Sequence, residues 1–313
     1  MLRQAENNVT IIGTLSENNI KYGSYEKDGI TYETIGGSIN VLVKQEINGA
    51  EQQMEIPIQL FSQKYIKSGP KKGEINPAYE SIEKVMQSYV SIAAAASTGA
   101  TPDRVRITKA KITMNEYFNG ANQLVSFPRI SATFVNKATD NMKDCATFTS
   151  EFVVSSMARV TDSEGIEVEP TKLKIMGVVS QYGGKIDVVP FYAVTPNAIS
   201  SIEQYWEPNS SVKVEGKLNF TSVTTTIVEE NADDWFGEPT EKTRTSTVSE
   251  LIITAGSRPL ADNLAFDMEE INKGIAERKA RLQKMKDKPA ANHGAKKAPA
   301  STTSTSQMDD LGF

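Results

Sequence analysis

The amino-acid sequence predicts an all-β-dominated fold with short helices, arranged as two small barrels in tandem and followed by a helix and a disordered tail. Three observations support this fold class. Apolar and polar residues alternate in many short segments, which is the period of a strand with one buried face. Turn residues such as Asn-Gly separate several of these segments. In each half of the chain a helical pattern stands between the third and the fourth strand.

Composition limits the classes of protein to which the chain can belong. Its 313 residues are 39% hydrophobic, which is enough for a sizeable buried core. No apolar run is long enough to span a membrane, and the start of the chain does not read as a leader, so we expect a cytoplasmic protein. Cys145 is the single cysteine and His293 the single histidine. An intrachain disulfide, Cys/His zinc sites and catalytic triads are therefore excluded.

The first half of the chain contains five predicted strands and one helix. A Gly- and Tyr-rich loop or hairpin follows the first strand, and a basic, Gly/Pro-broken loop precedes the helix, whose start is marked by Asn76-Pro77. The predicted strands cover residues 7–17, 39–44, 52–61, 103–118 and 122–135, and the helix covers about 77–96.

Alternation also assigns side chains to the two faces of these strands. In the third strand it directs Phe61 away from the core. In the fifth strand it directs Leu124 and Phe134 toward the core, and Phe127 and Arg129 to the opposite face.

The second half repeats this order. Strands are predicted at residues 146–160, 171–183, 185–194, 210–220 and 246–256, with a short helix at 197–206. Three strands, a helix and two strands are the order of an OB barrel, so we predict two tandem OB-fold domains. The expected domains are residues 1–137 (first barrel and main binding site), 138–262 (second, acidic barrel), 263–286 (helical segment) and 287–313 (disordered tail). The helical segment is expected to dock on the second barrel; the alternative is an arm to another subunit.

The strand at residues 210–220 carries a resemblance to a known family. Val212, Val214, Glu215, Gly216 and Leu218 form a Val-x-Val-Glu-Gly-x-Leu strand after a short helix, with Gly216 on the buried face, where it permits a bend. This pattern resembles the bacterial single-stranded-DNA-binding protein family, of bacterial or phage type. The resemblance implies a protein that coats single-stranded DNA during DNA replication, recombination and repair.

The last residues of the sequence add to the resemblance. Residues 308–313 are similar to the acidic, hydrophobic tip through which that family recruits replication and recombination proteins. On a disordered tether, such a tip can be captured by basic, apolar pockets on partner proteins. The resemblance implies that the partner-binding residues are Asp309, Asp310, Leu311 and Phe313.

Single-stranded nucleic acid is bound by OB barrels through aromatic rings that stack on bases and cations that attract phosphates. We therefore searched for aromatic and basic residues on the polar sides of strands and in the loops of the first half, which has 15 Lys/Arg against 13 Asp/Glu. The candidate ssDNA-binding residues are Tyr22, Tyr25, Tyr32, Lys44, Phe61, Lys64, Lys71, Lys72, Arg104, Arg106, Lys109, Lys111, Tyr117, Phe118, Phe127 and Arg129.

The second half is unsuited to phosphates, because residues 138–262 hold 10 Lys/Arg against 19 Asp/Glu. Its aromatic pair Trp235-Phe236 lies in a loop rich in carboxylates. We interpret this loop as a subunit contact in a homo-oligomer or as a flap that competes with DNA.

Two other classes of function remain open. Asp233, Asp234 and Glu238 could ligate Mg²⁺ in a DNA-processing enzyme, although no general base is evident nearby. A two-barrel protein that binds partners without nucleic acid is the other alternative. We expect a non-enzymatic protein with no metal and no cofactor, and binding to oligo-dT at low and high salt would separate the three classes.

Overall fold

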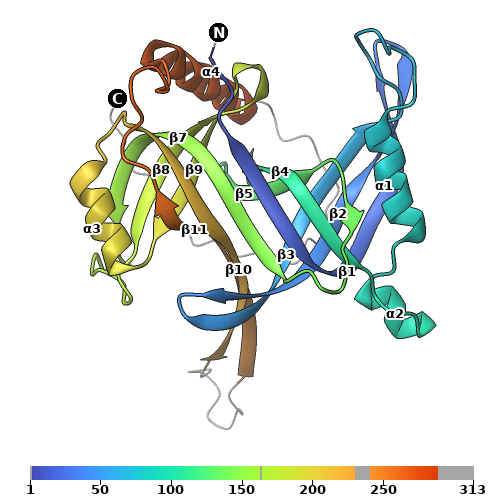
Figure 1. The fold of residues 1–313 in the computed structure, drawn as a ribbon, viewed down its shortest axis with the longest axis horizontal. Coiled ribbons are helices and arrows are strands. Elements are labelled where there is room, and N and C mark those ends of the chain that lie inside the picture. The colour runs from blue at the N-terminus through green and yellow to red at the C-terminus, as the bar shows by residue number, and fades with distance from the viewer. Residues whose placement is uncertain (1, 163, 230–239, 288–313) are drawn as a thin grey trace.

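The computed structural model describes residues 2–162, 164–229 and 240–287, and for residues 222–247 only the backbone is considered. Most of its elements are strands, with a few helices between and after them (Figure 1). In chain order they are β1 (Asn7–Lys27), β2 (Ile30–Ile47), β3 (Ala50–Gln63), α1 (Pro77–Ser88), α2 (Ile92–Thr98), β4 (Arg104–Phe118), β5 (Leu124–Ala132), β6 (Asn136–Lys137), β7 (Cys145–Arg159), β8 (Leu173–Ser180), the 3₁₀ turn η1 (Tyr182–Gly184), β9 (Ile186–Ala193), α3 (Pro196–Tyr205), β10 (Ser211–Glu229), β11 (Thr240–Gly256) and α4 (Met268–Lys286).

The first five long strands close into a barrel. Antiparallel pairing joins β1 to β2, β2 to β3, β5 to β4 and β4 back to β1, and a short parallel pairing joins β3 to β5. Helix α1 stands between the third and fourth strands. This connectivity is that of the OB fold. It confirms the fold class that the alternating pattern predicts for this half.

The second half closes in the same way. Strands β7, β8 and β9 pair in sequence, β9 meets β11 in parallel, and β10 pairs with both β11 and β7. The register of β10 against β11 shifts between Glu215 and Gly216. A Cβ on Gly216 would lie 2.2 Å from the Ile252 carbonyl oxygen and 2.4 Å from the Phe148 ring, so only glycine fits at this bend. The expected second OB barrel is therefore present.

The two barrels are parts of one continuous sheet. Strands β1 and β7 pair antiparallel from Asn7 opposite Ser150 to Ile12 opposite Cys145. The buried side chain of Gln45 strengthens this junction, because it donates to the Leu218 carbonyl (2.9 Å) and accepts from the backbone N–H of residue 146 (2.8 Å). The buried apolar side chains of both barrels form a single cluster.

The predicted helix at 77–96 is wrong in one respect, because α1 and α2 are separate. Tyr89 ends α1 in an extended conformation. Its ring is buried against the barrel, and its hydroxyl donates to the Val135 carbonyl (3.2 Å). The Val90 N–H donates to Asp103 (2.8 Å), and Ser91 caps α2. These tertiary contacts outweigh the local preference of an Ala-rich segment for helix.

Helix α4 docks on the body of the protein at the top of Figure 1, near the N-terminus. Ile271 is fully buried, and Gly274 lies so close to Ile186 of β9 that a Cβ would be 2.4 Å from that side chain. Further along the helix, Arg278 forms an ion pair with Glu116 of β4. The helix therefore contacts both barrels. None of the described helices combines the length and the apolar composition needed to cross a membrane.

Candidate nucleic-acid interface

Phe61 is an exposed aromatic side chain on the outer wall of the first barrel. Leu60 points into the core and is fully buried, whereas Phe61 is 58% exposed. Phe61 lies opposite Gly36 on β2, which in turn lies opposite Lys21 on β1. A Cβ on Gly36 would be 3.1 Å from the Phe61 ring. The missing side chain at Gly36 thus leaves room for the ring, and no side chain separates Phe61 from Lys21 at this register position.

Two tyrosines of the β1–β2 hairpin form a cluster with Lys67, four residues beyond the pair Lys21 and Gly36 along the strands. Tyr25 and Tyr32 lie opposite each other and stack, with ring centroids 5.2 Å apart. The ammonium group of Lys67 lies 4.2 Å from the centre of the Tyr32 ring and donates to the Tyr25 hydroxyl (2.6 Å). Gln63, two residues after Phe61, also donates to that hydroxyl. We call Lys21, Tyr25, Tyr32, Phe61 and Lys67 the Phe61 surface.

A second aromatic pair lies on the same wall, on β4 and β5. Tyr117 and Phe127 pack edge to face with centroids 6.4 Å apart, and exposed Arg129 follows on β5. We call Tyr117, Phe127 and Arg129 the Phe127 surface. Because Ile58 of β3 pairs with Ile130, Phe127 is level with position 55, six residues before Phe61. At ~3.3 Å per residue the two surfaces are about 20 Å apart along the strands.

Leu124 and Phe134 do not face the core as predicted. Leu124 is 36% and Phe134 49% exposed. Leu124 is at the hairpin end of β5, and Phe134 follows its last residue, Ala132, so neither is covered by the barrel. Ile130 and Ala132 are buried, as the alternation predicts, and Phe127 and Arg129 lie on the opposite face.

The basic residues of β4 follow a different wall, next to β1 and the second barrel. Arg106 is exposed, and Lys109 adopts φ 60° at the irregularity in the β1–β4 register. Lys111 donates to Asn8 (3.1 Å), and burial lowers the pKa of its ammonium group. Arg104 forms a 2.7 Å ion pair with Asp144. Arg104 therefore holds the connection between the barrels, and the four basic residues do not join the Phe61 surface.

The remaining candidates are scattered around the barrel. Phe118 is half-buried at the end of β4, Lys44 is exposed near the far end of β2, and Lys71 and Lys72 are exposed in the turn before α1. The other two candidates have partners: Lys64 pairs with Glu33 (2.8 Å), a contact that raises the pKa of Lys64, and Tyr22 donates to Glu83 (2.8 Å), which raises the pKa of Tyr22.

A cavity of about 360 Å³ lies beside the hairpin, between Tyr22, Lys64 and α1. Glu33, Glu80 and Glu83 line it, and Lys64 is already paired with Glu33. This excess of carboxylates would repel phosphates. Tyr22 and Lys64 are thus placed at an acidic cavity instead of on the Phe61 surface.

The candidate residues lack Lys21 and Tyr65, which lie near Phe61. Lys21 is exposed, and Tyr65 is 47% exposed four residues after Phe61. The signal for Tyr65 is the continuation of the strand alternation beyond Phe61. The pairing of Lys21 with Gly36 could not be read from local sequence, because it requires the register of β1 on β2.

Several predicted features lie outside the described residues. They are the Trp235-Phe236 loop with Asp233, Asp234 and Glu238, and the tail residues Asp309, Asp310, Leu311 and Phe313. Within the described ranges, no group of three or more His, Cys, Asp or Glu side chains is arranged to hold a metal ion.

Comparison with solved structures finds single-stranded DNA binding proteins at low sequence identity. Wild-type single-stranded DNA binding protein from Thermus aquaticus is 10% identical with a TM-score of 0.48, covering 83% of this chain and 95% of that chain. A deletion mutant of the same protein gives the same score and identity, with 97% of that chain covered. A replication protein A heterotrimer bound to ssDNA is 9% identical with a TM-score of 0.21, covering 88% and 53%.

No curated protein matches the sequence. The model of the YorF family matches residues 5–288. The resemblance to the bacterial single-stranded-DNA-binding family therefore does not define the family of this protein: the chain belongs to the YorF family.

Proposed function

We propose that this protein binds single-stranded DNA and does so on the first barrel. The observation that carries the proposal is the Phe61 surface, on which an exposed ring, a stacked tyrosine pair and two lysines share one wall of an OB barrel. Aromatic rings stack on unpaired bases for about 1–3 kcal/mol per base, and lysines neutralise phosphates. Duplex DNA keeps its bases stacked inside and cannot use the rings.

The Phe127 surface extends the proposed site along the barrel. Lys21 and Arg129 are exposed, and within the described residues neither side chain has a hydrogen bond or an ion pair. Both cations are therefore available to phosphates. A strand that ran from the Phe61 surface to the Phe127 surface would cover about 20 Å of wall, which suits the several nucleotides that one OB fold binds.

The corresponding strands of the second barrel, β8 and β9, are less suited to this role. Lys172 is paired with Glu250 (2.6 Å). Tyr192 and Lys174, opposite each other, are half-buried; burial raises the pKa of Tyr192 to about 12 and lowers that of Lys174. A ring and a cation that are already covered offer little surface to a base or a phosphate.

Fluorescence anisotropy with labelled oligo-dT tests the proposal. We expect tight binding at low salt, weaker binding as salt rises, and much weaker binding to a duplex of the same length, because counterion release and base stacking both contribute. Absence of oligo-dT binding at low salt would contradict the proposal and favour a two-barrel protein that binds partners only. Metal-dependent cleavage of the oligonucleotide would favour a DNA-processing enzyme.

We further propose that binding serves DNA replication, recombination and repair, without catalysis, and that the protein acts as a homo-oligomer in a bacterial cytoplasm or that of a phage host. Asp309, Asp310, Leu311 and Phe313 combine acidic and large apolar side chains, which suits basic, apolar pockets on partner proteins. Deleting residues 308–313 should leave oligo-dT affinity unchanged or raised and abolish capture of replication proteins from a cell extract. Loss of oligo-dT binding on this deletion would contradict the role of the tip.

A further inference from the structure

Among the residues that the structure describes, no strand pairs with one edge of the part of β4 that carries Tyr117. Strand β4 pairs with β1 only as far as Ala110, whereas its pairing with β5 continues to Phe118. Beyond Ala110, side chains from the start of β1 and from the second barrel bind the β4 backbone in place of a strand ladder. Asn7 accepts from the Ile112 N–H (3.0 Å) and donates to the Ile112 carbonyl (2.7 Å), and Asp187 of the second barrel accepts from the Met114 N–H (3.4 Å).

Farther along β4, at Glu116, helix α4 contacts the strand. The side chain of Glu116 is 6% exposed, and its carboxylate pairs with Arg278 and, at 3.5 Å, with Arg281. Arg278 is itself 15% exposed. A buried carboxylate is costly without a partner, so this ion pair strongly restrains the relative positions of β4 and α4.

Glu116 is next to the aromatic pair of the Phe127 surface. Side chains alternate along β4, so Glu116 points toward α4 and Tyr117 to the outer wall. Opposite them on β5 are Ser126 and Val125, the two residues that precede Phe127. Because Tyr117 packs against the edge of Phe127, a shift of Glu116 would displace both rings.

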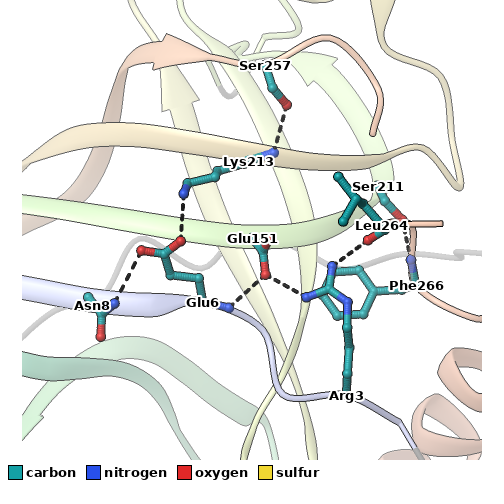
Figure 2. Close-up of polar contacts among 9 residues, drawn as sticks. All are labelled: Arg3, Glu6, Asn8, Glu151, Ser211, Lys213, Ser257, Leu264 and Phe266. Carbon is teal, nitrogen blue, oxygen red and sulfur yellow. Dashed lines mark hydrogen bonds and ion pairs between the residues drawn. The ribbon is translucent and has the colours of Figure 1, made fainter. Parts of the chain in front are cut away.

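Helix α4 is anchored before it reaches Glu116. Figure 2 shows the N-terminal clasp, in which the guanidinium of Arg3 pairs with Glu151 of β7 (2.7 Å), donates to the Leu264 carbonyl (2.6 Å) and lies 3.8 Å from the centre of the Phe266 ring. The Phe266 N–H donates to Ser211 of β10 (2.9 Å). The segment leading into α4 is thus held on the second barrel. Because α4 is fixed there, the ion pair of Arg278 with Glu116 fixes β4 relative to the second barrel.

We propose that Arg278 is a positioning residue for single-stranded DNA: it holds Glu116, and through it the Tyr117–Phe127 pair, in the geometry that stacks on bases. This inference rests on the proposed function. Arg278 is largely buried and would not touch DNA, so its effect on affinity would pass through the two rings.

A double-mutant cycle on the full chain tests this role. The variants are Arg278→Met, Phe127→Ala and their combination, measured by anisotropy with oligo-dT. We expect Phe127→Ala to weaken binding about fivefold or more, as for the loss of one stacked base. Arg278→Met should weaken it by a comparable or smaller factor and leave the salt dependence unchanged, because no phosphate contact is lost. In the Phe127→Ala background, Arg278→Met should have little further effect.

Arg159→Met is the matched control, since Arg159 also pairs with two glutamates, Glu203 and Glu167, but on the exposed surface of the second barrel. It should bind oligo-dT like the wild type. If Arg278→Met does not fold, Arg278→Lys, which keeps the charge but not the planar guanidinium, is judged by the same criteria.

The failures of the two proposals are distinguishable. If the wild-type protein does not bind oligo-dT, the proposed function is contradicted. A wild type that binds, together with an Arg278 variant that binds equally well, overturns the positioning role alone. The positioning role is also overturned if the double variant loses oligo-dT affinity by the product of the two single-variant factors, which would mean that the two residues act independently. It is overturned as well if Phe127→Ala binds oligo-dT like the wild type.

Discussion

The ring of Phe61 lies against Gly36, the residue opposite it on β2, where a Cβ would come within 3.1 Å of the ring and 2.8 Å of the Leu60 carbonyl oxygen. The glycine leaves the outer wall without a side chain between Phe61 on β3 and Lys21 on β1. The Phe61 surface therefore depends on Gly36, a residue with no side chain that could contact a ligand.

Substitution Gly36→Val should disturb this surface. The added side chain meets the Phe61 ring and a backbone carbonyl that cannot move freely, so we expect a loss of about 1–3 kcal/mol in the free energy of unfolding. We also expect weaker oligo-dT binding. Urea unfolding and anisotropy measure the two effects. Gly120→Ala is the control, because a Cβ there has no atom within 4 Å; an equal loss in both variants would argue against the contact with Phe61.

Removing either exposed ring should cost binding. Phe61→Ala and Phe127→Ala should each reduce the affinity for oligo-dT by about 1–3 kcal/mol, the worth of one stacked base. Because the two rings are about 20 Å apart, their effects should add in the double variant. Anisotropy titrations at one salt concentration give the comparison. Tyr182→Ala removes an 84% exposed ring from the second barrel and should leave the affinity for oligo-dT unchanged. If this variant loses affinity and the two phenylalanine variants do not, the binding site lies on the second barrel.

Two arginines on the first barrel should behave differently. Arg129→Gln removes an exposed cation and should make the negative slope of log K against log salt shallower by about 0.7. Arg104→Gln breaks the 2.7 Å ion pair with Asp144 and the bond to the Met142 carbonyl, so it should lower the free energy of unfolding by about 1–3 kcal/mol. Its salt slope should stay that of the wild type. The reverse assignment of the two effects would show that Arg104 meets phosphates.

The carboxyl group of Asp187 should make stability depend on pH. Burial at the junction of the barrels, with the charge of nearby Glu116, raises the pKa of Asp187 above its ordinary value of 3.8, although Met114, Gln181 and Arg281 oppose the shift. The native state therefore holds this proton more tightly than the unfolded chain. Its contribution to stability is full below pH 3.8 and is lost as pH rises through the raised pKa.

The uncharged variant Asp187→Asn isolates this effect. Asparagine keeps an acceptor oxygen for Met114 and Gln181 but cannot ionise. It should be more stable than the wild type at neutral pH, and the difference should shrink as pH falls through the raised pKa toward 3.8, below which it no longer changes. Thermal unfolding across that range measures it. A variant that is less stable at neutral pH would mean that the ionised carboxylate contributes more through Arg281 than its burial costs.

Local sequence was sufficient for the parts of the fold that repeat a short pattern. Alternation identifies the buried faces of the strands, including Leu60 inside and Phe61 outside, because side chains on a strand point alternately to opposite sides. The Asn76-Pro77 start of α1 follows from capping chemistry, since the Asn76 side chain accepts from the residue 78 N–H. The bend at Gly216 follows from a glycine on a buried face.

Local pattern failed where a distant segment decides the conformation. Tyr89 breaks the Ala-rich helix because its hydroxyl reaches Val135, and Leu124 is exposed because the barrel does not extend beyond the hairpin end of β5. Alternation alone does not reveal that Arg104 is paired with Asp144, 40 residues away.

By itself the sequence determined the five long strands of each barrel, the helix position between the third and fourth of them, and the outward direction of Phe61 and Phe127, because each depends on neighbours a few positions apart. Only the tertiary structure decided that β1 pairs with β7, that Lys21 faces Phe61 across Gly36, and that Arg278 holds Glu116 from 162 residues away. These contacts depend on the register of the strands and on where α4 docks. Neither is encoded in any single segment, because burial of one continuous core shared by both barrels selects them together.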